Sequence, residues 1–189
     1  SLLMVFTALK LRAMAELTNP TILIVVDRID LDTQITGTFN ASDVPGLVTT
    51  DSRKELQMLL SQGARKIIIT TIHKFGEADG VLDDRQIIIA MVVEAHRSQE
   101  GDYGKKMREA LPNAFLFGLT GTPINKRDRN TFMWFGSPGD EGGYLSRYSF
   151  QDSIRDGATL PLHFEPRLSE IHLDQDKIDA AFEELAVGR

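Results

Sequence analysis

The chain contains a series of short apolar runs, rich in β-branched residues, separated by longer segments of mixed polarity. The runs lie within residues 22–26, 66–70, 87–93 and 115–119, and their apolar residues are consecutive rather than alternating with polar ones. Runs of this kind are typical of strands buried on both faces, as in a parallel sheet covered by helices. The pattern therefore predicts an α/β domain in which strands and helices alternate up to about residue 119.

The segments between the runs carry helix signals. Residues 2–17 repeat apolar side chains at helical spacing and end before Pro20. Ser52 and Glu55 fit a capping box, which predicts a helix that ends near Gly63. A further helix is predicted over 104–111. After residue 123 the pattern changes. Residues 125–147 are rich in Gly, Asp, Arg and Asn, with an exposed loop predicted at 136–139. A helix over 149–156, an extended stretch over 160–173 and a helix over 176–185 are predicted to follow.

Composition excludes several classes of protein. The chain has no cysteine, so disulfide frameworks, thiolate metal sites and cysteine nucleophiles are excluded. Its longest apolar stretch, residues 87–93, is far shorter than the roughly 20 residues of a membrane-spanning helix. The absence of cysteine fits a reducing compartment, and we expect a cytoplasmic location. The net charge of −6 disfavours general affinity for nucleic acids but does not exclude a local basic surface.

Polar residues follow each apolar run, where ligands bind in open parallel sheets. They lie within residues 27–28, 70–74, 94–99 and 120–123. Glu94, directly after the longest run, could orient a water for attack on a phosphoryl group. A helix-capping or solvated carboxylate is the alternative interpretation of an isolated Glu at this position. A carboxylate, hydroxyls and cations are thus predicted to converge on one edge of the sheet.

Four ordered motifs carry a family resemblance. Residues 93–99 resemble the Walker B segment of superfamily 2 helicases of the DEAH kind, and residues 119–123 resemble their third motif. Together with residues 25–31 and 70–75, these motifs resemble the motor part of the R subunit of type I restriction enzymes. The resemblance runs from Ser1 to at least Leu160 and includes 148–157.

The resemblance implies a RecA-like P-loop NTPase domain, with a mostly parallel sheet and helices on both faces. Residues 1–160 would be the first RecA-like motor domain, and residues 161–189 would lead towards a second one. The implied cofactors are ATP and Mg²⁺. The implied partners are double-stranded DNA and the methylation and specificity subunits of a restriction complex. The implied activity is ATP-driven movement of double-stranded DNA before cleavage.

The resemblance also assigns roles to single residues. Glu94 would be the base that activates water, and His96 would link the nucleotide to the DNA-facing surface. Thr120 and Thr122 would relay hydrolysis between these sites. Ser1 would be the hydroxyl residue of the phosphate loop and a ligand of Mg²⁺.

Three further residues are implied to face the DNA backbone. Arg28, Thr71 and Lys74 offer cations and a hydroxyl, which position phosphates without reading the base sequence. Such contacts suit a motor that moves along any DNA sequence.

Two departures from the family pattern stand out. The glycines and the lysine of the phosphate loop would precede Ser1, and Val93 stands where the family has an Asp that holds Mg²⁺ through its water shell. The isolated chain is therefore expected to bind ATP weakly and to be inactive. Val93 fits either a genuine loss or an altered fragment of an active parent. The alternative functions are a catalytically dead DNA-binding remnant and another superfamily 2 helicase or translocase.

Other candidate sites are weaker. The four histidines lack the spacing of a zinc site. Residues 105–108 and 126–129 are basic clusters, which are more often solvated faces than DNA contacts. Residues 132–135 could form a stacking platform for bases, although packing under a loop is the favoured interpretation.

Overall fold

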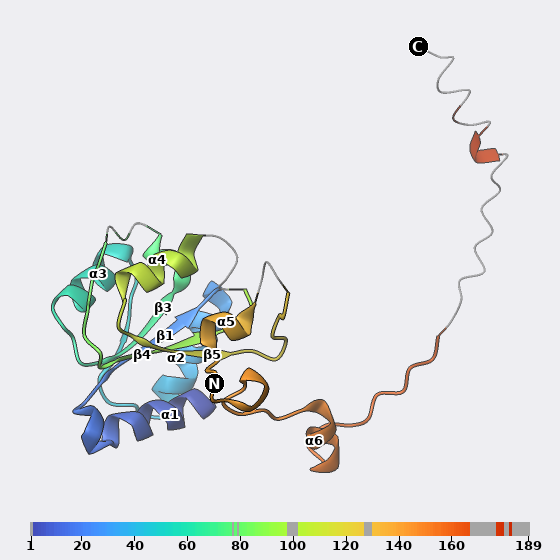
Figure 1. The fold of residues 1–189 in the computed structure, drawn as a ribbon, viewed down its shortest axis with the longest axis horizontal. Coiled ribbons are helices and arrows are strands. Elements are labelled where there is room, and N and C mark those ends of the chain that lie inside the picture. Colours follow the sequence, from blue (N-terminus) through green and yellow to red (C-terminus); the bar gives the residue numbers. More distant parts are fainter. Residues whose placement is uncertain are drawn as a thin grey trace. The chain divides into compact units, whose positions relative to one another are not determined.

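The chain forms two compact units, Ser1–Ser146 and Arg147–Arg189. A computed structural model describes residues 2–76, 78, 80–97, 102–126, 130–166, 177–179 and 182. The first unit holds a five-stranded sheet with the strand order β2-β3-β1-β4-β5, in which every pairing is parallel (Figure 1). The predicted α/β class with a parallel sheet is therefore confirmed.

Four of the five strands coincide with the apolar runs. They are β1 (Thr21–Val26), β3 (Ile67–Thr71), β4 (Ile88–Val93) and β5 (Phe115–Leu119). Every residue of β1 and β3 is buried, as expected for strands covered on both faces. The sequence interpretation missed β2 (Leu47–Thr49), an edge strand of three residues, none of which is fully buried.

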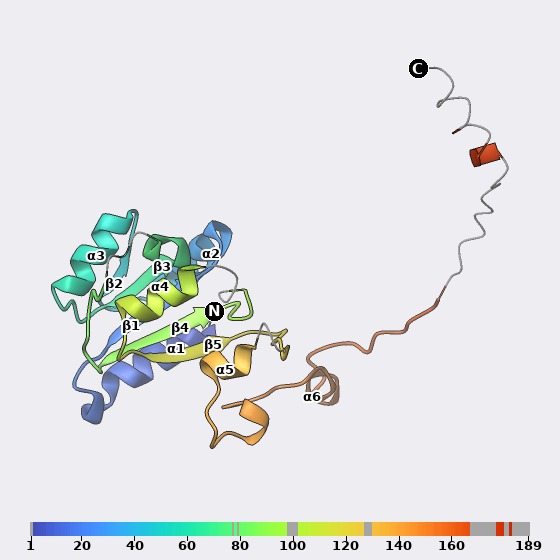
Figure 2. The ribbon, with the colours of Figure 1, turned by 45° about the horizontal axis from the view of Figure 1, so that its top comes forward.

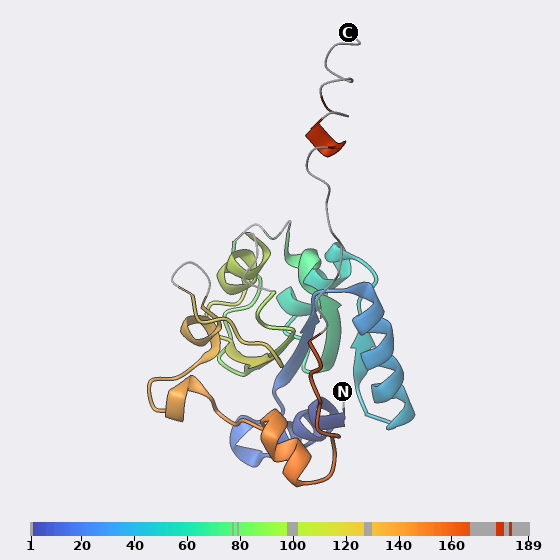
Figure 3. The same cartoon turned by 90° about the vertical axis from the view of Figure 1, so that its right-hand side faces the viewer.

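Helices cover both faces of the sheet and bury two separate cores. α1 (Leu2–Ala13) and α2 (Ile29–Ala41) pack on one face, and α3 (Arg53–Ser61) and α4 (Asp102–Ala110) pack on the other (Figure 1). Figure 2 shows α1 and α3 on opposite sides of the strands. In Figure 3, α2 lies beside the strands against which it packs. The alternation of side chains along each buried strand supplies both cores, so a single strand sequence holds helices on either side.

The predicted helices differ from the observed ones at their ends. α1 ends at Ala13, a 3₁₀ turn follows over Ala15–Leu17, and Thr18 and Asn19 adopt positive φ angles before Pro20. At α3, the Ser52 hydroxyl accepts a hydrogen bond from the Glu55 amide at 3.1 Å, as the capping pattern predicts.

α2 was not predicted as a separate helix. It contains several β-branched residues and Gly37, which disfavour helix. Its two fully buried side chains, Ile35 and Phe39, lie one turn apart and face the sheet core. Tertiary packing of this short apolar stripe outweighs the weak intrinsic propensity.

The segment over 125–147 was predicted only to contain an exposed loop at residues 136–139, and these residues form neither helix nor strand. It contains α5 (Thr131–Phe135) and a 3₁₀ turn over Glu141–Gly143. The Asn130 side chain begins α5 by accepting hydrogen bonds from the amides of Phe132 and Met133. Phe135 lies against Gly118 in β5, so the helix is held by contact with the sheet rather than by a periodic pattern.

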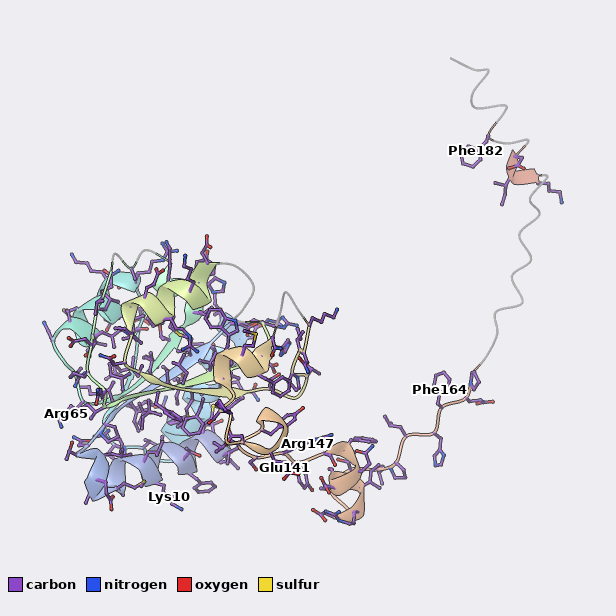
Figure 4. All side chains as sticks on the ribbon, viewed as in Figure 1. Lys10, Arg65, Glu141, Arg147, Phe164 and Phe182 are labelled. Carbon is purple, nitrogen blue, oxygen red and sulfur yellow. The ribbon has the colours of Figure 1, made fainter. Side chains whose placement is uncertain are left out.

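A group of hydrogen-bonded polar side chains lies at the amino-terminal edge of the sheet. Arg85 donates hydrogen bonds to both oxygens of Asp83 and to the Thr21 hydroxyl. The Asp83 hydrogen bond raises the pKa of Arg85 against the opposing effect of burial. Arg65 donates to the Thr18 carbonyl at the same edge (Figure 4). These contacts join segments far apart in sequence, away from the edge where ligands are expected.

The second unit contains α6 (Phe150–Arg155), within the predicted helix over 149–156. Ser149 and Asp152 form a reciprocal capping box. Residues 160–166 form neither helix nor strand, and Phe164 is exposed (Figure 4). The rest of the predicted extended stretch, and most of the predicted helix over 176–185, lie outside the described residues. The domain boundary near residue 160 stays a prediction.

Within the described part of the chain, no helix is both long and apolar enough to cross a membrane.

Candidate functional site

The candidate site lies at the carboxyl edge of the sheet, between the ends of β4 and β5. These strands pair in parallel, with Val93 opposite Leu119. Glu94 and His96 follow β4 directly, and Thr120 follows β5 directly. The sequence prediction that these side chains share one edge is therefore confirmed by the parallel register.

The His96 imidazole is the centre of a hydrogen-bonded cluster. Its Nδ1 shares a hydrogen bond of 2.7 Å with the Thr120 hydroxyl and lies 3.4 Å from the Thr122 hydroxyl. The Thr120 hydroxyl accepts a further hydrogen bond of 3.1 Å from the Thr122 amide. The Glu94 carboxylate lies 3.5 Å from the same Nδ1. Four residues implied by the family resemblance thus meet around one ring nitrogen.

The direction of the hydrogen bond between His96 and Thr120 depends on which nitrogen of the imidazole carries the proton. The Thr120 hydroxyl can donate to a bare Nδ1 or accept from an Nδ1–H. In the first case the imidazole is neutral with its proton on Nε2, and in the second Nδ1–H also faces the Glu94 carboxylate. The His96 side chain is 16% exposed, against 41% for Glu94. The cluster therefore joins an enclosed ring to a carboxylate that water can reach.

Glu94 sits on an unusual backbone conformation. Its φ angle is +52°, in the left-handed region that non-glycine residues rarely adopt. The following Ala95 is fully buried and its amide donates to the Leu119 carbonyl at 3.2 Å, while the Arg97 amide donates to the Glu94 carbonyl at 2.8 Å. Left-handed non-glycine residues cost about 1–3 kcal/mol and persist where the surroundings hold them. The turn is thus fixed tightly at the point where Glu94 is presented.

Asp27 and Arg97 are polar residues of this edge to which the sequence interpretation assigned no role. Asp27 follows β1, the neighbour of β4, and its Oδ2 lies 3.7 Å from Arg97 Nη1. The Asp27 side chain is 11% exposed, and its Oδ1 is buried without a hydrogen-bond partner among the described residues. The position of Asp27 in the sequence could have indicated it, because Asp27 follows β1 as directly as Glu94 follows β4.

The three residues expected to face DNA lie near the ends of β1 and β3. Arg28 is exposed and pairs with Asp30 at 3.2 Å. Thr71 is buried, at 7% exposure. Lys74 donates to the backbone carbonyl of Thr50 and, at 3.3 Å, to its hydroxyl. The exposed Arg28 can meet a ligand as it stands, whereas Lys74 is held by the protein, and the DNA-facing roles of all three stay predictions.

Ser1, the expected hydroxyl ligand of Mg²⁺, lies outside the described residues. Among the residues that are described, no three His, Asp or Glu side chains are grouped so that they could hold a metal ion. The Val93 side chain at the end of β4 offers no oxygen atom. Mg²⁺ is usually held by one or two carboxylates together with substrate phosphates and waters, so ligands beyond the described residues would be needed to hold it.

The aromatic segment over 132–135 is only partly packed, which bears out the favoured interpretation in part: Phe132 and Phe135 are half-buried, whereas Met133 is 81% and Trp134 39% exposed. Arg108 lies 5.1 Å from the centre of the Trp134 ring and donates to the Trp134 carbonyl. Burial lowers the pKa of Arg108. Phe132 makes an edge contact with Tyr144. Of the predicted basic clusters, residues 127–129 lie outside the described part of the chain.

The fold is that of an ATPase family. Residues 1–189 match the SWI2/SNF2 ATPase family, and the chain belongs to it. The chain is similar to subunits of type I restriction enzymes. It is 37% identical over 191 residues to a putative type I restriction enzyme MjaIXP endonuclease subunit of Methanocaldococcus jannaschii. It is 38% identical over 208 residues to the type I restriction enzyme HindI endonuclease subunit of Haemophilus influenzae.

These alignments cover nearly all of this chain but little of each relative. They include 98% of the chain in both cases, and 18% and 19% of the two relatives. A putative MjaVIIIP endonuclease subunit of Methanocaldococcus jannaschii is 31% identical over 76% of the chain. The predicted resemblance to type I restriction R subunits is confirmed, and the chain spans less than a fifth of the length of the first two relatives.

Proposed function

We propose that this chain is part of the ATP-driven DNA translocase of a type I restriction enzyme, in which ATP hydrolysis moves double-stranded DNA before cleavage. The observation that carries the proposal is the cluster of Glu94, His96, Thr120 and Thr122 at the edge between β4 and β5. The family match and the restriction-enzyme relatives support it.

Glu94 is the group that accepts a proton in this proposal. Its carboxylate is 41% exposed, so a water can approach it, and the rigid turn fixes its direction. A carboxylate in this position takes a proton from the water that attacks the terminal phosphoryl group. His96 and the two threonines then respond to changes at Glu94, because they share the Nδ1 contact.

ATP and Mg²⁺ are the proposed cofactors of the whole protein. Mg²⁺ would neutralise charge on the phosphates when bound. Because the described residues do not form a metal site, no step of the proposal is assigned to the metal. Ser1 remains the proposed hydroxyl ligand, and residues 1–160 remain the proposed first motor domain.

Double-stranded DNA is the proposed substrate, with the methylation and specificity subunits of a restriction complex as partners. Arg28 is the best placed of the three candidate DNA contacts, because its side chain is 58% exposed and paired with a single exposed carboxylate. A phosphate can replace Asp30 at small cost, since surface ion pairs contribute about 0–1 kcal/mol. Handling of DNA also fits the proposed cytoplasmic location.

Val93 favours a second candidate function, a DNA-holding module without turnover. An isopropyl group at the end of β4 cannot hold the water shell of Mg²⁺. The hydrogen bonds around His96 do not include Val93, so the cluster persists without that carboxylate. This candidate and the motor differ in hydrolysis, not in the arrangement of the edge.

A chimaera tests the two candidates. The segment of the Haemophilus influenzae subunit that aligns with this chain is replaced by residues 1–189, with Val93 or with Val93→Asp. The rate of ATP hydrolysis is measured with and without duplex DNA. Glu94→Gln in each background is the matched control, because it keeps the size of the side chain and removes the base.

The motor proposal expects DNA-stimulated hydrolysis in the Val93→Asp chimaera and its loss on adding Glu94→Gln. Hydrolysis by the Val93 chimaera at the rate of its Glu94→Gln control, with retained duplex binding, favours the DNA-holding module for the present sequence. Background hydrolysis in the Val93→Asp chimaera, when it folds and binds duplex DNA, would reject the motor assignment.

A further inference from the structure

Asp27 is a buried carboxylate with incomplete pairing. Its side chain is 11% exposed, Oδ1 is buried without a partner among the described residues, and Oδ2 meets Arg97 at 3.7 Å. Burying a carboxylate costs free energy unless a cation or donors compensate. A neutral side chain would avoid this cost, so the negative charge at Asp27 calls for a role beyond stability. The charge meets Arg97, three residues after Glu94.

The turn that presents Glu94 is held from two sides. On the β5 side, the Ala95 amide donates to Leu119, and His96 bonds to Thr120. On the β1 side, the ion pair between Asp27 and Arg97 supplies the link. A left-handed residue keeps its conformation when its neighbours are fixed on both sides. The ion pair therefore bears on the conformation of Glu94 although Asp27 does not touch it.

We propose that Asp27 is a positioning residue for Glu94, acting through Arg97 on the turn over residues 94–97. The inference rests on the proposed role of Glu94 as the base. Asp27 is also the neighbour of Arg28, the exposed candidate for phosphate contact. A phosphate that replaces Asp30 at Arg28 would bind one residue from Asp27, which contacts Arg97 in the turn that carries Glu94. The ion pair thus connects the DNA-facing loop after β1 with the hydrolytic edge after β4.

The exposure of the two side chains indicates which of them moves when the ion pair breaks. Arg97 is 52% exposed, so it can leave Asp27, whereas Asp27 is enclosed and cannot follow it into water. Loss of the pair leaves a buried carboxylate without its cation, which favours rearrangement of the loop. The turn then loses its support on the β1 side while its β5 contacts remain.

Amide hydrogen exchange in the 189-residue chain, followed by NMR without nucleotide or DNA, tests the inference. Asp27→Asn removes the negative charge with little change of size, and Arg97→Gln replaces the cation by a shorter neutral side chain. Each is expected to speed exchange of the Ala95 amide roughly tenfold, the order expected from releasing a strained turn. The double variant should exchange no faster than the singles, because both remove the same interaction. Arg97→Lys keeps the cation and should stay within about threefold of the parent chain.

Exchange at Met91 separates a positioning role from a general loss of stability. Met91 lies in the buried part of β4, and its amide should keep its rate in every variant. Unchanged Ala95 exchange, equal acceleration at Met91, or additive effects of the two single variants would each overturn the proposal. If Asp27→Asn does not fold, Arg97→Gln decides, because its site is half exposed. No ATP is needed, so a failed hydrolysis assay on the chimaera leaves this result independent.

Discussion

Replacing Val93 by Asp tests how much packing and charge at the end of β4 contribute to the free energy of unfolding. Val93 ends β4 opposite Leu119 and packs, partly buried, against the core beneath α1 and α2. Full burial of a Val side chain is worth about 1.5–3 kcal/mol, so this partly buried one contributes roughly 1 kcal/mol. Loss of a β-branched residue from the strand costs up to about 1 kcal/mol more. Partial burial of the new carboxylate beside Glu94 adds about 1 kcal/mol. We expect Val93→Asp to lower the free energy of unfolding by about 2–3 kcal/mol in total.

Urea denaturation of the 189-residue chain measures this loss, with Val93→Asn as the matched control. Asn has nearly the shape of Asp without its charge, so the two variants share the packing loss and differ in electrostatics. We expect Val93→Asn to retain about 1 kcal/mol more than Val93→Asp, which is the part of the loss assigned to the partly buried charge.

Two results would refute the reasoning. If the variants unfold at the same urea concentration as the parent chain, Val93 contributes nothing through packing. If Val93→Asn loses as much stability as Val93→Asp, the charge of the new carboxylate contributes nothing to the loss.

Three further predictions concern the scaffold. Gly118→Ala would place a Cβ atom 2.6 Å from Cγ of Phe135, and we expect the urea midpoint to fall with a loss of about 1–3 kcal/mol. Arg85→Gln strands the nearly enclosed Asp83 carboxylate and should cost about 3 kcal/mol in the same assay. Hydrogen bonds from the Ser149 hydroxyl and amide hold the pKa of Asp152 below its ordinary value of 3.8. The contribution of Asp152 to α6 is therefore complete above about pH 3.8 and is lost as the pH falls through the lower value of the folded state, which amide shifts of α6 would report.

Matched controls sharpen these three predictions. Gly121→Ala adds a Cβ with no neighbour within 4 Å, so it should leave stability unchanged, and an equal loss there would contradict the steric explanation. A double change of Arg85→Met and Asp83→Leu should recover much of the stability lost in Arg85→Gln, because no buried charge remains. Ser149→Ala should shift the acid loss of α6 upward in pH, and an unchanged transition would contradict the capping account.

The sequence predicted the parts of the fold that depend on local pattern. β1, β3, β4 and β5 were found because strands buried on both faces are apolar along their whole length. β2 was not predicted because it has only three residues, at a sheet edge, and three residues are too few to show a periodic pattern. α5 was not predicted for a related reason. Its position depends on the contact of Phe135 with Gly118, which the spacing of apolar residues along the sequence does not indicate.

The features of the candidate site likewise divide into those that the sequence predicts and those that require the three-dimensional structure. Glu94 and Thr120 could be placed on one edge from sequence, because parallel strands bring their carboxyl ends together. The contact of His96 with Thr120 and Thr122, and the left-handed backbone of Glu94, required the register of β4 against β5. The pair of Asp27 with Arg97 required the strand order, because β1 and β4 are neighbours in space but not in sequence.

The defect at Val93 is therefore chemical rather than architectural. The turn after β4 draws its hydrogen bonds from the Leu119 carbonyl and from its own backbone, and His96 draws its partners from residues after β5. None of these contacts uses the side chain at position 93, so exchange of a carboxylate for an isopropyl group leaves Glu94 presented as before. The valine also continues the apolar surface of β4 against the core, which stabilises the strand end that carries the turn. Under the proposed function, the chain keeps the arrangement of the edge after β4 while lacking one carboxylate that hydrolysis would need.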